Sequence, residues 1–294
     1  MFRNAVSTAM GFTRPVVISR QAKNGACSSS IGAFVVVNEE GWILTAAHVM
    51  TQISELLAQE AAFKKTELEQ QEIEKLDISS KEKRKKLHAL PKYSNDHTIN
   101  CSVWWSHSHQ SVQEAHLLPH ADLALAKLDN FDPNSVSVYP TFKDPGKDYE
   151  PGTSLCKLGF PFHSITPIWE TQTCSFRLPA GAIPIPFFPI EGIFTRVAQI
   201  VLNGAPPPPI PHLWVESSSP GLRGQSGGPT FDTQGTIWAI QANTAHMPLG
   251  FNARVSPNSR DNVPQFLNVG RGVHMKTVLG LLDQRGVKHI VSAY

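Results

Sequence analysis

Three residues that lie far apart in the chain have the types and local settings of a nucleophilic catalytic centre. Ser226 stands in a glycine-rich run, His48 follows an apolar run, and Asp122 precedes another apolar run. A serine hydroxyl is a weak nucleophile at neutral pH, so it needs a base such as histidine to take its proton. A carboxylate beside that histidine fixes the imidazole tautomer and stabilises the cation that forms. The sequence therefore predicts Ser226 as nucleophile, His48 as general base and Asp122 as the residue that orients the base.

The run at 223–229 also offers backbone N–H groups that could stabilise a reaction intermediate. Attack on a carbonyl creates an oxyanion, which backbone N–H groups can stabilise. Glycine at position 224 permits a sharp turn, so we expect an oxyanion hole formed by Gly224, Gln225 and Ser226. Asp96 is the alternative to Asp122, because it also lies between the histidine and the serine. No apolar run follows Asp96 directly, and Asp122 is therefore preferred.

Most of the chain consists of short apolar runs that are typical of β-strands. The runs at 33–37 and 42–45 flank a turn and predict a hairpin, and 123–128, 194–201 and 236–240 predict further strands. The chain contains 23 prolines, which favour turns and loops over helices. These features predict an all-β fold.

Two segments depart from the β pattern. Residues from about 52 to 90 are rich in Glu, Lys, Gln, Leu and Ala, and predict an amphipathic helix or a helical hairpin with a break at 77–80. Its charged face is either a solvated surface or a contact site for a regulatory protein partner. Residues 274–285 predict a C-terminal helix that ends at Gly286.

Composition narrows the classes of protein that need to be considered. The 294 residues are 41% hydrophobic and carry a net charge of +2, which indicates a globular protein and gives no strong field for nucleic acid. No stretch is long and apolar enough for a membrane span, and the N-terminal residues do not resemble a secretory signal. The four cysteines form no CxxC pair, which argues against a zinc site and predicts reduced thiols and a cytoplasmic protein.

Five histidines, at positions 97, 107, 109, 116 and 120, crowd one region of the sequence. His107 and His109 would share one face of a strand, so a metal site is an alternative there. No cysteine or carboxylate ligand pattern accompanies them, and a surface strand is the preferred interpretation. We expect neither a metal nor a cofactor.

The segments 45–48 and 224–229 resemble the histidine and serine motifs of the chymotrypsin/trypsin-like serine proteases. The order His, Asp, Ser along the chain also matches that family. Within the family, the runs 32–48 and 157–161 are similar to the HtrA-like branch of bacteria and organelles. The chain after Ser226 is too short for the PDZ domain of typical HtrA proteins, so a member without that domain is expected.

The resemblance implies two six-stranded antiparallel β-barrels with the active site in the cleft between them. The first, within 1–135, would carry His48, Asp122 and the helical insertion at about 52–90. The second, within 136–294, would carry Ser226 and the C-terminal helix. The implied activity is that of a bacterial serine endopeptidase acting on polypeptides. The alternatives are a non-catalytic module of the same fold that binds a peptide or a partner, and an esterase-type acyl hydrolase.

Two departures from the family bear on activation and specificity. Secreted members have an aspartate before the nucleophile, which pairs with a new amino terminus after cleavage. This chain has Gln225, so we expect no activation by N-terminal trimming. By the same resemblance, the base of the pocket for the residue preceding the scissile bond (P1) is Pro220. Its walls are expected to come from Ala242, Asn243, Thr244 and, opposite them, Gly250. No acid is present at the base, and a small or medium apolar P1 residue is expected.

Overall fold

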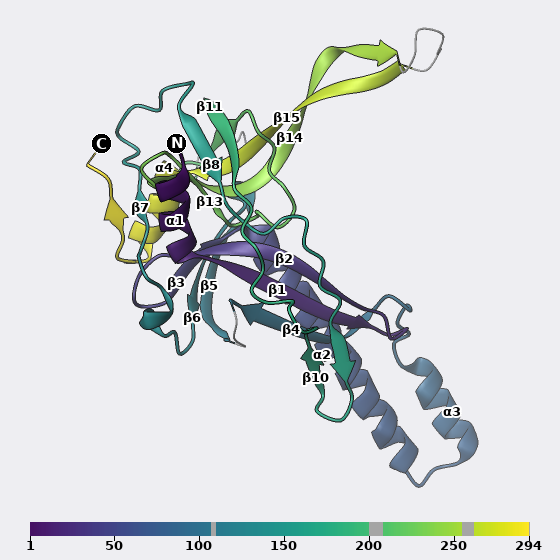
Figure 1. Cartoon of the computed structure of the whole chain (residues 1–294). Coiled ribbons are helices and arrows are strands. Elements are labelled where there is room, and N and C mark those ends of the chain that lie inside the picture. Colours follow the sequence, from purple (N-terminus) through teal and green to yellow (C-terminus); the bar gives the residue numbers. More distant parts are fainter. Residues whose placement is uncertain (107–109, 200–207, 255–261, 294) are drawn as a thin grey trace.

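The fold is built on two curved, mainly antiparallel sheets from which two long segments project (Figure 1). The computed structural model describes residues 1–106, 110–199, 208–254 and 262–293, with the backbone alone at 251–254 and 262–264. The predicted all-β class with a helical insertion and a C-terminal helix is confirmed.

The first sheet carries the first two predicted site residues at one of its ends. It contains β1 (Thr13–Ala22), β2 (Cys27–Val36), β3 (Trp42–Thr45), β4 (Thr98–Trp105), β5 (Val112–Leu118) and β6 (Leu123–Leu128). The strand order is β4-β1-β2-β3-β6-β5, and all the pairings are antiparallel. The predicted β2–β3 hairpin is present, and β6 covers the predicted run 123–128.

The second sheet closes on itself. Its strands are β7 (Thr141–Phe142), β8 (Ser154–Lys157), β11 (Ile190–Gln199), β12 (Leu213–Ser217), β13 (Pro229–Phe231), β14 (Ile237–Arg254), β15 (Asn262–His274) and β16 (Ile290–Val291). The order β13-β8-β11-β12-β15-β14 becomes a six-membered ring because β13 also pairs with β14. The short strands β7 and β16 extend the sheet through parallel pairings that the sequence did not predict. The predicted strand 194–201 lies within β11, except for 200 and 201, which fall outside the described residues.

Smaller elements complete the framework. A separate two-stranded sheet contains β9 (Ile168–Glu170) and β10 (Ser175–Arg177), and two short 3₁₀ helices are η1 (Pro119–Ala121) and η2 (Pro133–Ser135). Helix α1 (Arg3–Phe12) was not predicted. Its Phe12 is fully buried, and Phe2 just before it packs edge-on against Phe231 of β13. The helix therefore contacts the second sheet before the chain enters β1 of the first.

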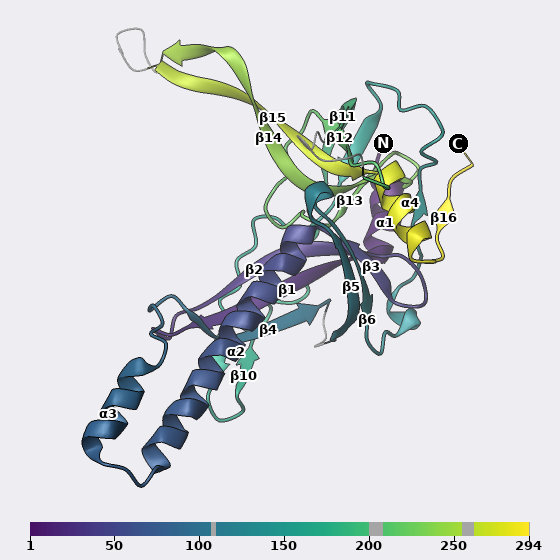
Figure 2. The same cartoon turned by 180° about the vertical axis from the view of Figure 1, so that it is seen from behind.

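The predicted helical hairpin consists of α2 (Ala47–Lys75) and α3 (Ser80–Ala89), which project together from the body of the molecule (Figure 2). The break falls where the sequence placed it. Ser79 caps α3 through a reciprocal pair of hydrogen bonds with Glu82, which satisfies N–H groups that the helix itself cannot pair. The buried residues of α2 all lie between Ala47 and Leu56, and α3 has none. Most of the hairpin is therefore exposed to solvent.

The second projection is an arm formed by the outer parts of β14 and β15 (Figure 1). These strands stay paired well beyond the closed ring, with Met247 opposite Leu267 and Pro248 opposite Phe266. Helix α4 (Met275–Gln284) is the predicted C-terminal helix; it follows β15 and buries one apolar face, and Gly286 beyond it has a positive φ of 65°.

Candidate active site

The pairing of β3 with β6 brings His48 and Asp122 together. These strands are antiparallel neighbours in which Thr45 lies opposite Ala124. His48 comes three residues after Thr45, in the first turn of α2, and Asp122 comes two residues before Ala124. Because the end of one antiparallel strand meets the start of its neighbour, residues 74 positions apart share one edge of the sheet.

The Asp122 carboxylate binds both the imidazole ring and the backbone N–H of His48. The Nδ1 atom of His48 lies 2.8 Å from Oδ2 and 3.0 Å from Oδ1 of Asp122, and the His48 backbone N–H donates to Oδ1 at 2.9 Å. That N–H belongs to the first turn of α2, where no intrahelical acceptor exists. Asp122 itself has a left-handed backbone with φ 53°, a conformation that aspartate tolerates better than most residues. The arrangement leaves Nε2 of the imidazole as the nitrogen that faces away from the carboxylate.

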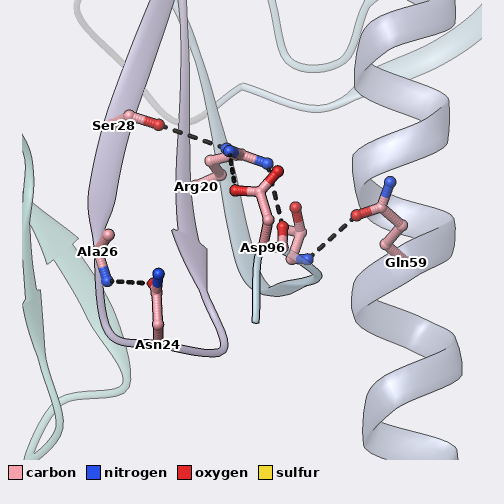
Figure 3. Close-up of polar contacts among 7 residues, drawn as sticks. Arg20, Asn24, Ala26, Ser28, Gln59 and Asp96 are labelled. Atoms are coloured by element: carbon pink, nitrogen blue, oxygen red, sulfur yellow. Dashed lines mark hydrogen bonds and ion pairs between the residues drawn. The ribbon is translucent and has the colours of Figure 1, made fainter. Parts of the chain in front are cut away.

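Asp96, the alternative partner, lies elsewhere and is already paired. Figure 3 shows its carboxylate beside Arg20 of β1, with Nη2 of Arg20 at 2.8 Å from Oδ1 of Asp96. The Arg20 Nε atom also donates to Ser28 Oγ across the β1–β2 hairpin, and nearby Gln59 of α2 accepts from the backbone N–H of Thr98. Asp96 thus joins the segment between α3 and β4 to β1, and no hydrogen bond or ion pair of the described residues joins it to His48.

The loop that carries Ser226 is fixed from three directions. The N–H of Ala33 in β2 donates to the Ser226 carbonyl at 2.8 Å, and the N–H of Phe160 donates to the Gly224 carbonyl at 2.8 Å. From β14, the Gln241 carbonyl accepts from Gly227 N–H at 2.7 Å. The first sheet, the segment after β8 and the second sheet therefore all position this loop.

Two glycines make this close packing possible. Gly227 has a φ of 84°, and a Cβ atom there would meet the Ala33 carbonyl and the Thr45 side chain. Gly159 lies in the run 157–161; a Cβ atom there would lie 2.7 Å from both Gln225 Cα and the Gly224 carbonyl. The segment that supported the HtrA-like resemblance therefore packs directly behind the serine loop.

Of the three residues expected to form the oxyanion hole, one uses its backbone N–H in a hydrogen bond within the loop and, in the described part of the chain, two do not. The N–H of Gln225 donates to the Leu222 carbonyl at 3.0 Å, so it is turned into the loop. Within the described ranges, neither Gly224 N–H nor Ser226 N–H donates a hydrogen bond. Gln225 is fully buried, and its side-chain oxygen accepts from Leu222 N–H at 3.0 Å. A neutral amide thus secures this loop directly before the serine.

His48 and Ser226 line one cavity of about 730 Å³, here called the His48 cavity. Its other walls come from β1 and β2, from the start of α2, and from Phe160, Phe162, His163 and residues 222–224. In the described part of the chain no hydrogen bond joins the Ser226 hydroxyl to His48. Such bonds are often long without substrate and shorten in the complex. The cavity is therefore lined by both an oriented base and the serine.

A second cavity of about 480 Å³, here called the Pro220 cavity, is also lined by Ser226. Four of the residues expected around a P1 pocket line it: Pro220, Ala242, Asn243 and Thr244. The fifth, Gly250, does not line it, because β14 continues past the closed ring and carries this glycine out along the arm. The sequence did not reveal the further lining residues Leu222, Arg223, Gln241, His246 and Asn268, of which all but Leu222 are polar.

Lys157 was missed as a site residue and lies immediately beneath this cavity. Its side chain is 2% exposed, and its amine donates to the Ser219 carbonyl, to Ser219 Oγ at 2.8 Å and to the Pro220 carbonyl at 3.2 Å. Burial lowers the pKa of Lys157 to about 7. Lys157 ends β8 and begins the run 157–161 that packs behind the serine loop, and its type alone does not indicate burial.

We expect the stability of the protein to rise with pH because of this lysine. Above pH 7 the folded state loses the Lys157 proton, while the unfolded chain keeps it up to about pH 10.4. The unfolded state then binds more protons, so the free energy of unfolding should rise by roughly 1 kcal/mol per pH unit in that window. Urea unfolding at pH 7.5 and 9 should show this rise in the wild type and not in Lys157→Met. Equal pH slopes in the two proteins would contradict it.

The crowded histidines separate into unrelated settings. His97 packs against Tyr93 with ring centres 4.2 Å apart, His116 stacks on Trp42, and His120 stacks on His212. His107 and His109 lie outside the described residues. Among the residues that the structure describes, no group of three or more His, Cys, Asp or Glu side chains could hold a metal ion. The helices within those same ranges include none with the length and hydropathy of a membrane span.

Comparison with known proteins supports the same family. Residues 32–240 match the family described as the trypsin-like peptidase domain. The active form of the Rv3671c protease from M. tuberculosis is 14% identical, with 98% of this chain and 86% of that chain covered and a TM-score of 0.48. An HtrA-type protease, AlgW with tripeptide, is also 14% identical, with coverages of 97% and 63% and a TM-score of 0.49. No significant match was found among curated protein sequences. Because the family match spans most of the sequence, including His48, Asp122 and Ser226, the chain belongs to the trypsin-like peptidase family.

Proposed function

We propose that this chain is a serine endopeptidase that uses Ser226, His48 and Asp122. The observation that carries the proposal is the shared cavity, which is lined by Ser226 and by His48, whose Nδ1 is bound to Asp122. Family membership supports peptide-bond hydrolysis as the reaction. The polypeptide substrate would cross this cavity with its scissile carbonyl at the serine.

In the proposed mechanism, His48 Nε2 takes the proton of Ser226 Oγ as the oxygen attacks the carbonyl carbon. Asp122 keeps Nδ1 protonated and stabilises the imidazolium that results. The unused N–H groups of Gly224 and Ser226 stabilise the oxyanion, since no other acceptor among the described residues occupies them. His48 then gives its proton to the leaving amine, and water, activated in the same way, hydrolyses the acyl-enzyme.

Labelling with a fluorophosphonate, measured by intact mass, tests this proposal. The reagent forms a bond to an activated serine oxygen with loss of fluoride, so the wild type should gain one adduct and Ser226→Ala none. Ser30 lines the same cavity, and Ser30→Ala is the matched control, which should be labelled like the wild type. Absence of an adduct on the wild type, or its retention on Ser226→Ala, would contradict the proposal. Faster turnover of esters with no peptide cleavage would instead indicate an esterase.

A further inference from the structure

If the proposed function holds, the two cavities that share Ser226 bind different parts of a peptide substrate. Leu222, Arg223 and Ser226 line both of them, so a chain crossing the serine would lie in both. The residue that protonates the leaving amine must lie on the leaving-group side. His48 lines only the His48 cavity, so the Pro220 cavity takes the residue before the scissile bond, P1.

The charge around both cavities is of one sign. No carboxylate lines either of them, as far as the described residues extend. Arg223 lines both, its side chain is exposed, and no carboxylate of the described residues pairs with it. An unpaired guanidinium beside the nucleophile, with five N–H donors in a planar fork, is well suited to bind a carboxylate.

The floor and walls of the Pro220 cavity are compatible with an anion. The Lys157 amine donates to the Ser219 and Pro220 carbonyls, so these oxygens already have donors and repel an incoming carboxylate less. The walls add the polar side chains of Asn243 and Asn268. A cationic P1 side chain would face Arg223 and meet no carboxylate among the described lining residues.

We propose that Arg223 selects substrates with a carboxylate side chain, glutamate or aspartate, at P1. The guanidinium reaches the P1 side chain at the mouth of the Pro220 cavity and forms charge-assisted hydrogen bonds with it. This assignment rests on the proposed endopeptidase function and replaces the apolar P1 residue expected from the sequence.

The test compares kcat/KM for four quenched fluorescent peptides that differ only in having Glu, Gln, Ala or Lys at P1. Glutamine has nearly the shape of glutamate without its charge, so the Glu/Gln ratio isolates the electrostatic part. We expect a ratio of about ten or more in the wild type, as for a charge-assisted contact at a partly exposed site. The ratio should fall to about one in Arg223→Gln and remain high in Arg223→Lys. Arg223→Glu should favour the Lys peptide.

Arg285→Gln is the matched control, because Arg285 is an exposed arginine that lines neither cavity. It should keep the wild-type ratio. Preference for Gln, Ala or Lys over Glu by a fluorophosphonate-reactive wild type would overturn the inference, as would failure to cleave the Glu peptide or a Glu/Gln ratio unchanged in Arg223→Gln. Failure of the labelling itself would instead refute the proposed function, so the two failures are distinguishable.

Discussion

Replacing Asp122 by asparagine is expected to lower kcat/KM for peptide cleavage roughly 10⁴-fold, in proportion to what loss of this carboxylate costs in related triads. An asparagine amide can present N–H to Nδ1 of His48, which places the imidazole proton on Nε2, where Ser226 requires a free lone pair. Asparagine also tolerates the left-handed backbone at this position, so the fold should remain intact. Steady-state kinetics on a P1-matched peptide measure the loss, and thermal unfolding checks the fold.

Asp96→Asn serves as the control for this experiment. Its carboxylate is exposed and pairs with Arg20, so this variant should keep nearly full activity. Loss of activity in Asp96→Asn with retention in Asp122→Asn would show that the assignment of the third residue is wrong.

The second large effect is expected from Gly227→Ala. This position combines a φ of 84° with direct contact between a new Cβ atom and the Ala33 carbonyl and Thr45 side chain. Backbone strain and overpacking should together cost about 3 kcal/mol or more, and displacement of the loop should abolish the hydrogen bond from Ala33 to Ser226. We therefore expect a large fall in the urea midpoint, together with loss of fluorophosphonate labelling.

Gly25→Ala separates the two causes. Gly25 has a similar φ of 86°, but an added Cβ atom meets nothing within 4 Å. This variant should cost only about 1 kcal/mol, from backbone strain alone. Equal destabilisation by the two substitutions would mean that the contact between the serine loop and the first sheet contributes little.

Local patterns in the sequence predicted the elements that depend on local forces. The break between α2 and α3 was visible because Ser79 and Glu82 have capping-box spacing, which acts over four residues. The run 123–128 was visible as β6 because both of its faces are largely buried. Helix α1 was missed because its apolar stretch is short. Its burial depends on the distant Phe231.

The catalytic candidates could be predicted from short sequence motifs. Some of the cavity walls could not, because they are formed by strands that are far apart in the sequence. The types and order of His48, Asp122 and Ser226 were sufficient to nominate them. The walls of the Pro220 cavity come from β14 and β15, whose long pairing depends on contacts between segments that are remote in sequence. For that reason Gly250 was misplaced, and Asn268 was not foreseen. Lys157 escaped notice because nothing local shows that an amine will be buried against carbonyl oxygens.

The placement of His48 on α2 has a mechanical consequence. This one helix of 29 residues starts at Ala47, so the imidazole sits at the base of a stiff rod whose free end lies roughly 40 Å away. A sideways push of about 4 Å at that end equals a tilt of only about 6° at the base, given the helix rise. The buried residues Val49, Met50, Ile53 and Leu56 hold the base of this rod, so we expect displacements of the exposed part to be taken up largely before they reach the imidazole.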